Sequence, residues 1–180
     1  DNGEQAIVSD LIGTKTLTSF PSGNTFDGGS SFGSIFNIDG RFDIDFGTGM
    51  ISDGKLRVEV SGSGIQTWEV GFAGAIATLL NPGDSTHSLG YYDFDESNFI
   101  GSSLKVDGTG SASIHGDILG IFMDKASTIG AVGGFNLHEV GNTSNYVYGG
   151  YTLVEDNFLT SEEIDAGFGS RGLFVTASAE

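Results

Sequence analysis

Cysteine is absent from the sequence, and proline occurs only twice in 180 residues. Without cysteine the chain has no disulfide bonds, and thiol catalysis, iron–sulfur clusters and cysteine-ligated zinc are excluded. The scarcity of proline is accompanied by 30 glycines. This balance favours many short strands with tight turns, because glycine tolerates the positive φ angles that turns and sharp bends require.

Basic residues are also scarce. Seven Lys and Arg residues stand against 24 Asp and Glu, which gives a formal net charge of −17. A surface of this charge repels phosphate backbones and anionic lipids, so we expect no nucleic-acid partner. No apolar run reaches the roughly 18 residues that a membrane-spanning helix needs, and we expect no transmembrane segment.

Aromatic residues, in contrast, are plentiful, and 14 phenylalanines contribute to an aromatic fraction of 11%. A chain with this content can bury a core, whereas disordered chains are poor in aromatic residues. We expect a single domain over residues 1–180, because this length supports one hydrophobic core without metals or disulfide bonds.

Strict alternation of polar and apolar residues begins in the first third of the chain. It is regular from Arg41 to Phe46 and again from Lys55 to Val60, with Ser52-Asp53-Gly54 as a turn signal between them. A period of two places one face of each strand in the core. These segments therefore predict a β-hairpin with its turn at residues 52–54.

The same pattern continues along the chain. Further strands are expected at residues 67–72, 103–106, 111–115, 118–123, 131–137 and 146–153, with turns at 81–84, 107–108 and 116–117. Turn signals about every eight to twelve residues are typical of an all-β sandwich or barrel. Closure into a barrel would also remove the exposed strand edges that invite aggregation.

The two ends of the chain are less regular. We interpret residues 1–30 as an N-terminal extension that could hold a strand or one helical turn, residues 31–156 as the barrel, and residues 157–180 as an irregular C-terminal tail. Within the tail, Thr160-Ser161-Glu162-Glu163 resembles a helix start, and residues 173–176 could add a last strand.

A glycine-rich pattern in the second half of the chain resembles a known barrel family. The barrel domain of transferrin-binding-protein-B-like bacterial surface proteins has a strand–turn–strand pattern that is matched here by Gly120-Ile121-Phe122, Ala126, Gly133-Gly134-Phe135 and Tyr148-Gly149-Gly150-Tyr151. The hairpin at residues 42–56 looks like the family's earlier hairpin, and the resemblance spans residues 32–153. It implies a single antiparallel, eight-stranded, up-and-down β-barrel. It also implies export to the periplasm, the outer-membrane surface or the extracellular space.

The histidines offer one candidate metal site. His115 and His138 are expected on neighbouring strands, where such a pair could ligate haem iron or zinc. No His-x-x-x-His spacing links them or His87, so isolated surface histidines are the simpler interpretation. We therefore assign no metal site and expect no cofactor, with haem and Ca²⁺ kept as alternatives.

Acidic residues cluster at Asp39, Asp43 and Asp45 and again at Asp93-Phe94-Asp95-Glu96. The second cluster begins like a calcium loop but lacks the glycine and the distal glutamate of an EF-hand. Asp43 and Asp45 occupy outward positions of a strand and have no special claim as a glycosidase pair. No Gly-x-Ser-x-Gly elbow precedes a helix, so we expect no enzyme.

Aromatic residues around the second acidic cluster are the candidate ligand-binding residues, namely Tyr91, Tyr92, Phe94 and Phe99. Such side chains offer contact area at low entropic cost. The sequence thus favours a non-catalytic binding module with a protein partner at the cell envelope or host surface. The alternative is a lipocalin-like carrier of a small apolar ligand or haem inside the barrel. Large residues expected to face inward favour a filled interior, namely Phe42, Phe46, Trp68, Phe72, Phe122 and Phe135.

Overall fold

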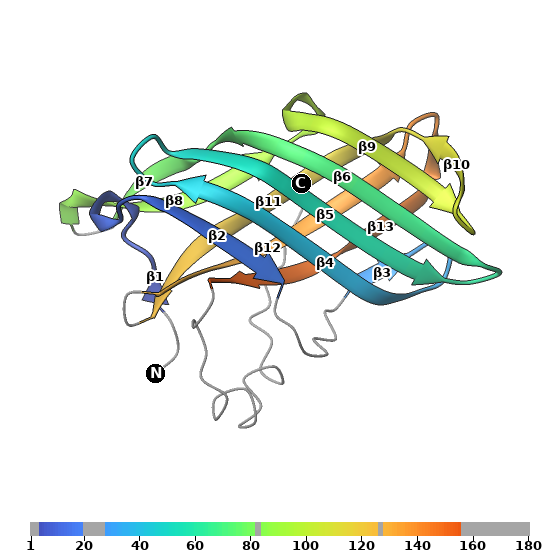
Figure 1. Ribbon diagram of the computed structural model, residues 1–180, viewed down its shortest axis with the longest axis horizontal. Coiled ribbons are helices and arrows are strands. Elements are labelled where there is room, and N and C mark those ends of the chain that lie inside the picture. Colours follow the sequence, from blue (N-terminus) through green and yellow to red (C-terminus); the bar gives the residue numbers. More distant parts are fainter. Residues whose placement is uncertain (1–3, 20–27, 82–83, 126–127, 156–180) are drawn as a thin grey trace, which may run out of the picture.

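The computed structural model describes residues 4–19, 28–81, 84–125 and 128–155 (Figure 1). Within these residues the chain is all-β and antiparallel, as the alternation predicts, and it contains no α-helix. Two 3-10 turns occur, η1 (Val8–Asp10) and η2 (Glu96–Asn98). The strands are β1 (Glu4–Gln5), β2 (Thr14–Ser19), β3 (Gly28–Ser30), β4 (Ser34–Asp45), β5 (Met50–Ser61), β6 (Ile65–Ala75), β7 (Ala77–Asn81), β8 (Asp84–Phe94), β9 (Phe99–Val106), β10 (Thr109–Ala112), β11 (Ile114–Lys125), β12 (Thr128–Glu139) and β13 (Asn142–Val154). The expected tail at residues 157–180, with its helix start and last strand, lies outside the described residues.

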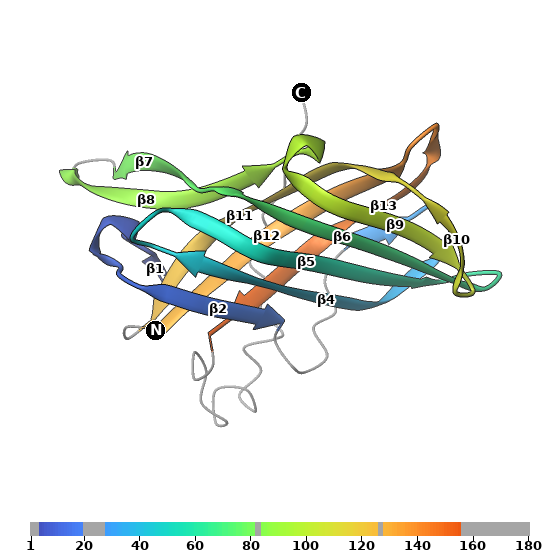
Figure 2. The same ribbon diagram turned by 45° about the horizontal axis from the view of Figure 1, so that its top comes forward.

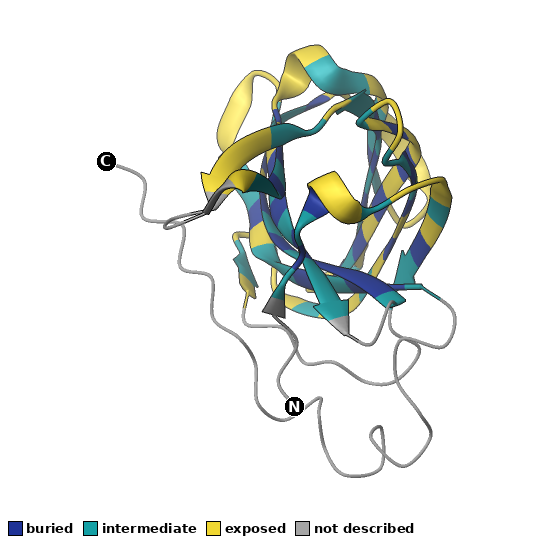
Figure 3. Cartoon of the chain, turned by 90° about the vertical axis from the view of Figure 1, so that its left-hand side faces the viewer, coloured by how far each residue is buried: buried dark blue, intermediate teal, exposed yellow. Residues whose placement is uncertain are grey.

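The described strands form one 13-stranded sheet in the order β10-β9-β6-β5-β4-β2-β13-β12-β11-β8-β7, with β1 paired to β11 and β3 to β13. The sheet is rolled, so that its strands surround a common interior (Figure 3). One wall carries β4, β5, β6 and β9, and the opposite wall carries β11, β12 and β13 (Figures 1 and 2). The path ends at β7 and β10, which do not pair with each other, so the expected closed eight-stranded barrel is not confirmed.

Alternation decides which side chains enter the interior. In β5, Leu56, Val58 and Val60 are buried, whereas Lys55 and Arg57 between them are exposed. The strands expected at residues 67–72, 103–106, 131–137 and 146–153 are confirmed as parts of β6, β9, β12 and β13. The turn expected at residues 81–84 lies where Asn81 of β7 pairs with Asp84 of β8.

The turn between β4 and β5 lies at residues 46–49, so the predicted position at residues 52–54 is wrong. The Gly47 N–H donates to Asp45 Oδ1 at 2.9 Å and stabilises the start of the turn. Asp53 and Gly54 instead form a bulge inside β5, where Asp53 has a φ of 50° and the register shifts. A Cβ at Gly54 would lie 2.4 Å from the Phe72 ring, so glycine serves close packing at this position.

The turn predicted at residues 116–117 is also wrong. β11 continues through this point, and Gly116 and Asp117 pair with Leu137 and Asn136 of β12. Gly116 has a φ of 138°, a conformation that other residues rarely adopt. The glycine therefore allows a local distortion of the strand without ending it.

Part of the predicted N-terminal extension belongs to the sheet. β2 lies between β4 and β13 and pairs with both, and its Leu17 is fully buried. η1 adds a helical turn before it, so both structures considered for this segment occur. Because β2 and β3 pair with β13, the boundary expected at residue 30 does not coincide with an edge of the sheet.

Aromatic rings occupy the interior between the two walls. The ring of Phe42 lies 5.5 Å from that of Tyr92 and 6.3 Å from those of Phe72 and Phe122. The rings of Phe72 and Phe94 are 5.6 Å apart. These separations are typical of packed aromatic pairs. Of the large residues expected to face inward, Phe42, Trp68, Phe72, Phe122 and Phe135 are buried, and Phe46 is partly buried against the core.

Candidate functional site

The aromatic residues proposed from the sequence do not form one exposed surface. Tyr92 and Phe94 are each 1% exposed, because they occupy inward positions of β8. Phe99 is partly buried against the core, and Tyr91 lies partly buried on the other face of β8. The segment from Tyr91 to Phe99 is thus mostly strand, and only residues 95–98 lie outside β8 and β9, as η2 and its cap.

Two of the interior tyrosines are joined through their hydroxyl groups. Tyr151 Oη donates to Tyr92 Oη at 2.9 Å and lies 3.2 Å from the Leu119 carbonyl oxygen. Burial raises the pKa of the Tyr92 phenol well above its usual value. Burial and the neighbouring Tyr92 likewise raise the pKa of Tyr151. Both phenols stay neutral in the folded protein at pH values at which exposed phenols ionise.

The two hydroxyl groups should differ in their effect on stability. Tyr151→Phe leaves the Tyr92 hydroxyl buried without that partner, and we expect a loss of about 1–3 kcal/mol. Tyr92→Phe costs less, because Tyr151 can still donate to the Leu119 carbonyl. In both cases urea unfolding measures the loss.

Because the folded-state pKa values of Tyr92 and Tyr151 are raised, the stability of the wild-type protein should fall as pH rises above about 10. The stability of a Tyr92→Phe/Tyr151→Phe variant should fall less steeply.

The acidic clusters have structural partners. Asp95 Oδ1 accepts from the backbone N–H and the hydroxyl of Ser97 and caps η2, and the side-chain hydrogen bond of Ser97 lowers the pKa of Asp95. Asp43 Oδ1 accepts from Thr16 Oγ1 at 2.6 Å. Within the described part of the chain, no three His, Asp or Glu side chains are grouped to hold a metal ion.

The structure does bring two of the three histidines together. His115 of β11 lies directly opposite His138 of β12, and their ring centres are 5.7 Å apart. Both occupy outward positions, since Ile114 and Leu137 beside them are buried. His87 is separate, with its Nε2 3.7 Å from Asp10 Oδ2.

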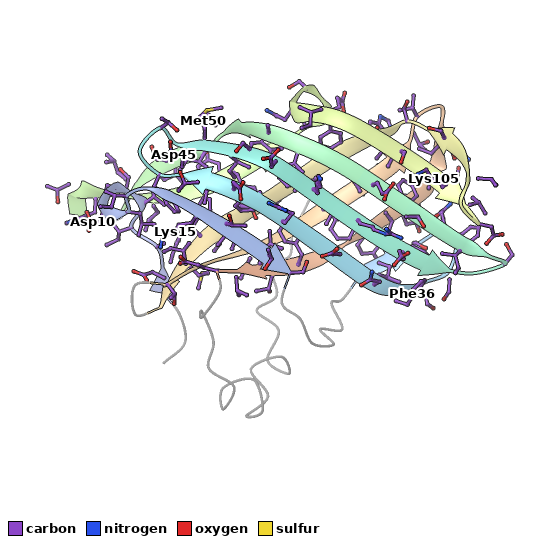
Figure 4. All side chains as sticks on the ribbon, in the orientation of Figure 1. Asp10, Lys15, Phe36, Asp45, Met50 and Lys105 are labelled. Carbon is purple, nitrogen blue, oxygen red and sulfur yellow. The ribbon has the colours of Figure 1, made fainter. Side chains whose placement is uncertain are left out.

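A groove of about 680 Å³ lies on the outside of the opposite wall, across β2, β4, β5, β6 and β9. We call it the outer groove and define it by Arg41, Lys55, Arg57, Glu69, Gly71 and Gly101, with Ile100 also lining it. A Cβ at Gly101 would meet no atom within 4 Å, whereas one at Gly71 would lie 3.2 Å from Ile100 Cγ1. Ile100 itself is 68% exposed. The stick view shows side chains projecting outward from this wall, with Phe36 and Asp45 at opposite ends of β4 (Figure 4).

Charged side chains form two rows across the outer groove, and the rows differ in their proportions of positive and negative charge. In the first row, Asp39 lies opposite Arg57, and Arg57 lies opposite Glu69. Arg57 Nη2 also donates to Glu59 Oε1 at 2.7 Å, and this hydrogen bond raises the pKa of Arg57. The one cation of this row is therefore fully paired, and the four side chains together carry a net negative charge.

The second row holds cations with little compensation. Arg41 lies opposite Lys55. Lys55 lies opposite Gly71 on its other side, and Gly71 lies opposite Gly101. Arg41 Nη2 lies 3.7 Å from Asp43 Oδ1, whereas Lys55 forms no ion pair with any described residue. Like charges directly opposite each other on a sheet are destabilising. The chain nevertheless places these two cations side by side on this wall, although its net charge is −17.

Sequence reasoning did not identify this site, although a signal was present. The alternation at residues 41–46 and 55–60 predicts which side chains of this hairpin face outward. Three of the seven basic residues are among them, namely Arg41, Lys55 and Arg57. The pairing of Arg41 with Lys55 depends on the bulge in β5, because the register shifts there.

Among the described residues, no helix has the length and apolarity needed to cross a membrane. The chain matches no protein-family model, no curated protein and no solved structure.

Proposed function

We propose that this chain is a non-catalytic binding module of an exported bacterial cell-envelope or surface protein, and that it binds a partner protein through the outer groove. The observation that carries the proposal is that Arg41 and Lys55 lie directly opposite each other, in the same row as the open backbone at Gly101. The absence of cysteine and the sequence resemblance to transferrin-binding-protein-B-like barrels support the exported location. Localisation would be the periplasm, the outer-membrane surface or the extracellular space.

The scaffold in this proposal is an eight-stranded, up-and-down barrel. Only Ile76 separates β6 from β7, and only Ser113 separates β10 from β11. β6 pairs with β9 and β7 with β8, so these four segments act as one long hairpin interrupted at residues 95–98. Counting interrupted strands as one gives β2, β4, β5, β6–β7, β8–β9, β10–β11, β12 and β13, which is eight. β8 also pairs with β11, which supports closure.

The interior opposes the alternative, a lipocalin-like carrier. A carrier needs a hollow centre, whereas here Phe42, Phe72, Tyr92 and Phe122 pack against one another at ring separations of 5.5–6.3 Å. His115 and His138 face outward and cannot ligate a haem held inside. Recognition therefore takes place on the outer surface.

The chemistry of the outer groove fits an extended acidic segment of a partner. Carboxylates of the partner would bind Arg41 and Lys55, with the guanidinium able to hold a carboxylate by two parallel hydrogen bonds. Ile100 offers an apolar contact at the edge of the groove. Gly101 leaves space for the partner backbone to approach closely. A segment that alternates acidic and apolar side chains would use all of these features.

A fluorescein-labelled peptide of alternating Glu and Leu is the probe for this proposal. We expect saturable binding at physiological salt, measured by fluorescence anisotropy, with affinity about tenfold lower in Arg41→Gln and in Lys55→Gln. A charge-assisted hydrogen bond contributes about 1.5–3 kcal/mol, and 1.4 kcal/mol corresponds to about tenfold.

Ser111→Glu is the matched control, because it also makes the chain more negative by one charge but lies on β10. Its affinity should stay close to wild type, since ionic screening limits surface charge effects to about 8 Å at this salt. Equal weakening in all three variants, or a wild-type chain that does not bind the peptide, would contradict the proposal.

A further inference from the structure

The two outward histidines on the wall opposite the outer groove form a cross-strand pair. His115 and His138 are directly opposite each other in the β11–β12 register, and their ring planes meet at 85°. Neither residue lines the outer groove, so this pair is independent of the function proposed above.

Not every ring nitrogen of the two histidines has a hydrogen-bond partner among the described residues. His115 Nε2 is buried and has no hydrogen-bond partner within the described residues. A buried polar atom left unpaired costs about 1–3 kcal/mol, so it calls for a physical explanation. His138 Nδ1 lies 3.4 Å from the Thr143 carbonyl oxygen. A proton on Nδ1 donates toward that oxygen and leaves the lone pair of Nε2 available to a metal.

The surroundings favour a cation over a neutral ligand. Asp117 lies on the same outer face of β11, and its position opposite Asn136 is next to the histidine pair in the register. A carboxylate on the same face as two imidazoles favours a cation over an anion at this position.

We infer that His115 and His138 form a surface site for a divalent transition metal of the Cu²⁺, Ni²⁺ or Zn²⁺ type. Imidazole is a preferred ligand for these ions, and Cu²⁺ binds tightest of the three at a given nitrogen site. Metal–nitrogen bonds of about 2.0–2.1 Å place the ring centres of two ligands roughly 5 Å apart. The observed separation of the two ring centres is 5.7 Å. Water completes the coordination, because the protein supplies two ligands.

Calorimetric titration of the full chain with CuCl₂ tests the site, with excess Mg²⁺ present to occupy the surface carboxylates. We expect one Cu²⁺ per chain, and at least tenfold weaker binding in both His115→Gln and His138→Gln. His87→Gln is the matched control and should bind as wild type does. Electron paramagnetic resonance of the wild-type complex should show coupling to two imidazole nitrogens.

Circular dichroism of each variant confirms that the sheet is retained, so a loss of binding reports on the ligands. Binding that is unchanged in the His115 and His138 variants, or a copper spectrum with oxygen ligands alone, would overturn the inference. Either result leaves the outer groove proposal unaffected, because that site uses different residues on the other wall.

Discussion

Replacing Phe42 with alanine is expected to lower the free energy of unfolding by about 3–5 kcal/mol, as for other buried large-to-small aromatic substitutions. Phe42 is fully buried, and its ring packs against those of Phe72, Tyr92 and Phe122. These residues come from four different strands, β4, β6, β8 and β11, so one substitution removes contacts between both walls. A loss of this size is a large share of the roughly 5–15 kcal/mol that stabilises a typical domain.

Urea unfolding followed by tryptophan fluorescence measures the loss, because Trp68 is buried in the same core. Phe36→Ala is the matched control, since Phe36 is also on β4 but is 55% exposed. Its effect should stay within about 0.5 kcal/mol, as for most surface substitutions. A similar loss in both variants would contradict a core centred on Phe42.

Gly116→Ala should have a comparable effect for a different reason. A Cβ at this position would lie 2.0 Å from the Asn136 carbonyl oxygen, which belongs to the paired strand β12. The φ of 138° adds backbone strain of about 1–3 kcal/mol for alanine. Forced displacement of packed atoms contributes another 1–3 kcal/mol or so, giving a total loss of about 2–6 kcal/mol.

Gly101→Ala is the control for this substitution, because a Cβ at Gly101 meets no atom within 4 Å. Its unfolding midpoint should remain close to wild type. Amide hydrogen exchange in the Gly116→Ala variant should speed up first along β11 and β12, where the strands must separate. A Gly116→Ala variant as stable as wild type would contradict the positive φ of this residue and its close approach to Asn136.

The regular strands were predictable because their alternation is local. Residues 55–60 show which side chains face the core without knowledge of any partner strand. The turn was misplaced because Ser52-Asp53-Gly54 has the residue types of a hairpin turn, whereas the structure uses them for a bulge under Phe72. Hairpin turns and β-bulges both use residues that adopt positive φ angles. Here only the packing of β6 against this segment distinguishes the bulge from a turn.

The tyrosine segment illustrates a second limit. Tyr91, Tyr92 and Phe94 stand beside several carboxylates, which favours a loop when the sequence is taken alone. β8 is formed by its pairing with β7 and β11, and the latter is distant in sequence. The acidic residues then fall on the outer face and in η2, while Tyr92 and Phe94 enter the core.

Both surface sites depend on register between strands. The sequence suggested neighbouring strands for His115 and His138, but only the β11–β12 pairing places them directly opposite each other. Arg41 and Lys55 meet in the same way, after the bulge shifts the β4–β5 register. A shift of one residue would send these side chains to the opposite face.

The central claim is that ligands bind outside the rolled sheet while its interior stays filled. A heteronuclear NMR titration with the Glu–Leu peptide tests it, with the amides of Gly71 and Gly101 as outer reporters and the Trp68 indole as the inner one. Trp68 Nε1–H donates to Gln66 Oε1 at 2.9 Å within the core. We predict saturable shifts of the two glycine amides and an unchanged indole resonance. A shifted indole with unchanged glycine amides would place the ligand inside and contradict the account.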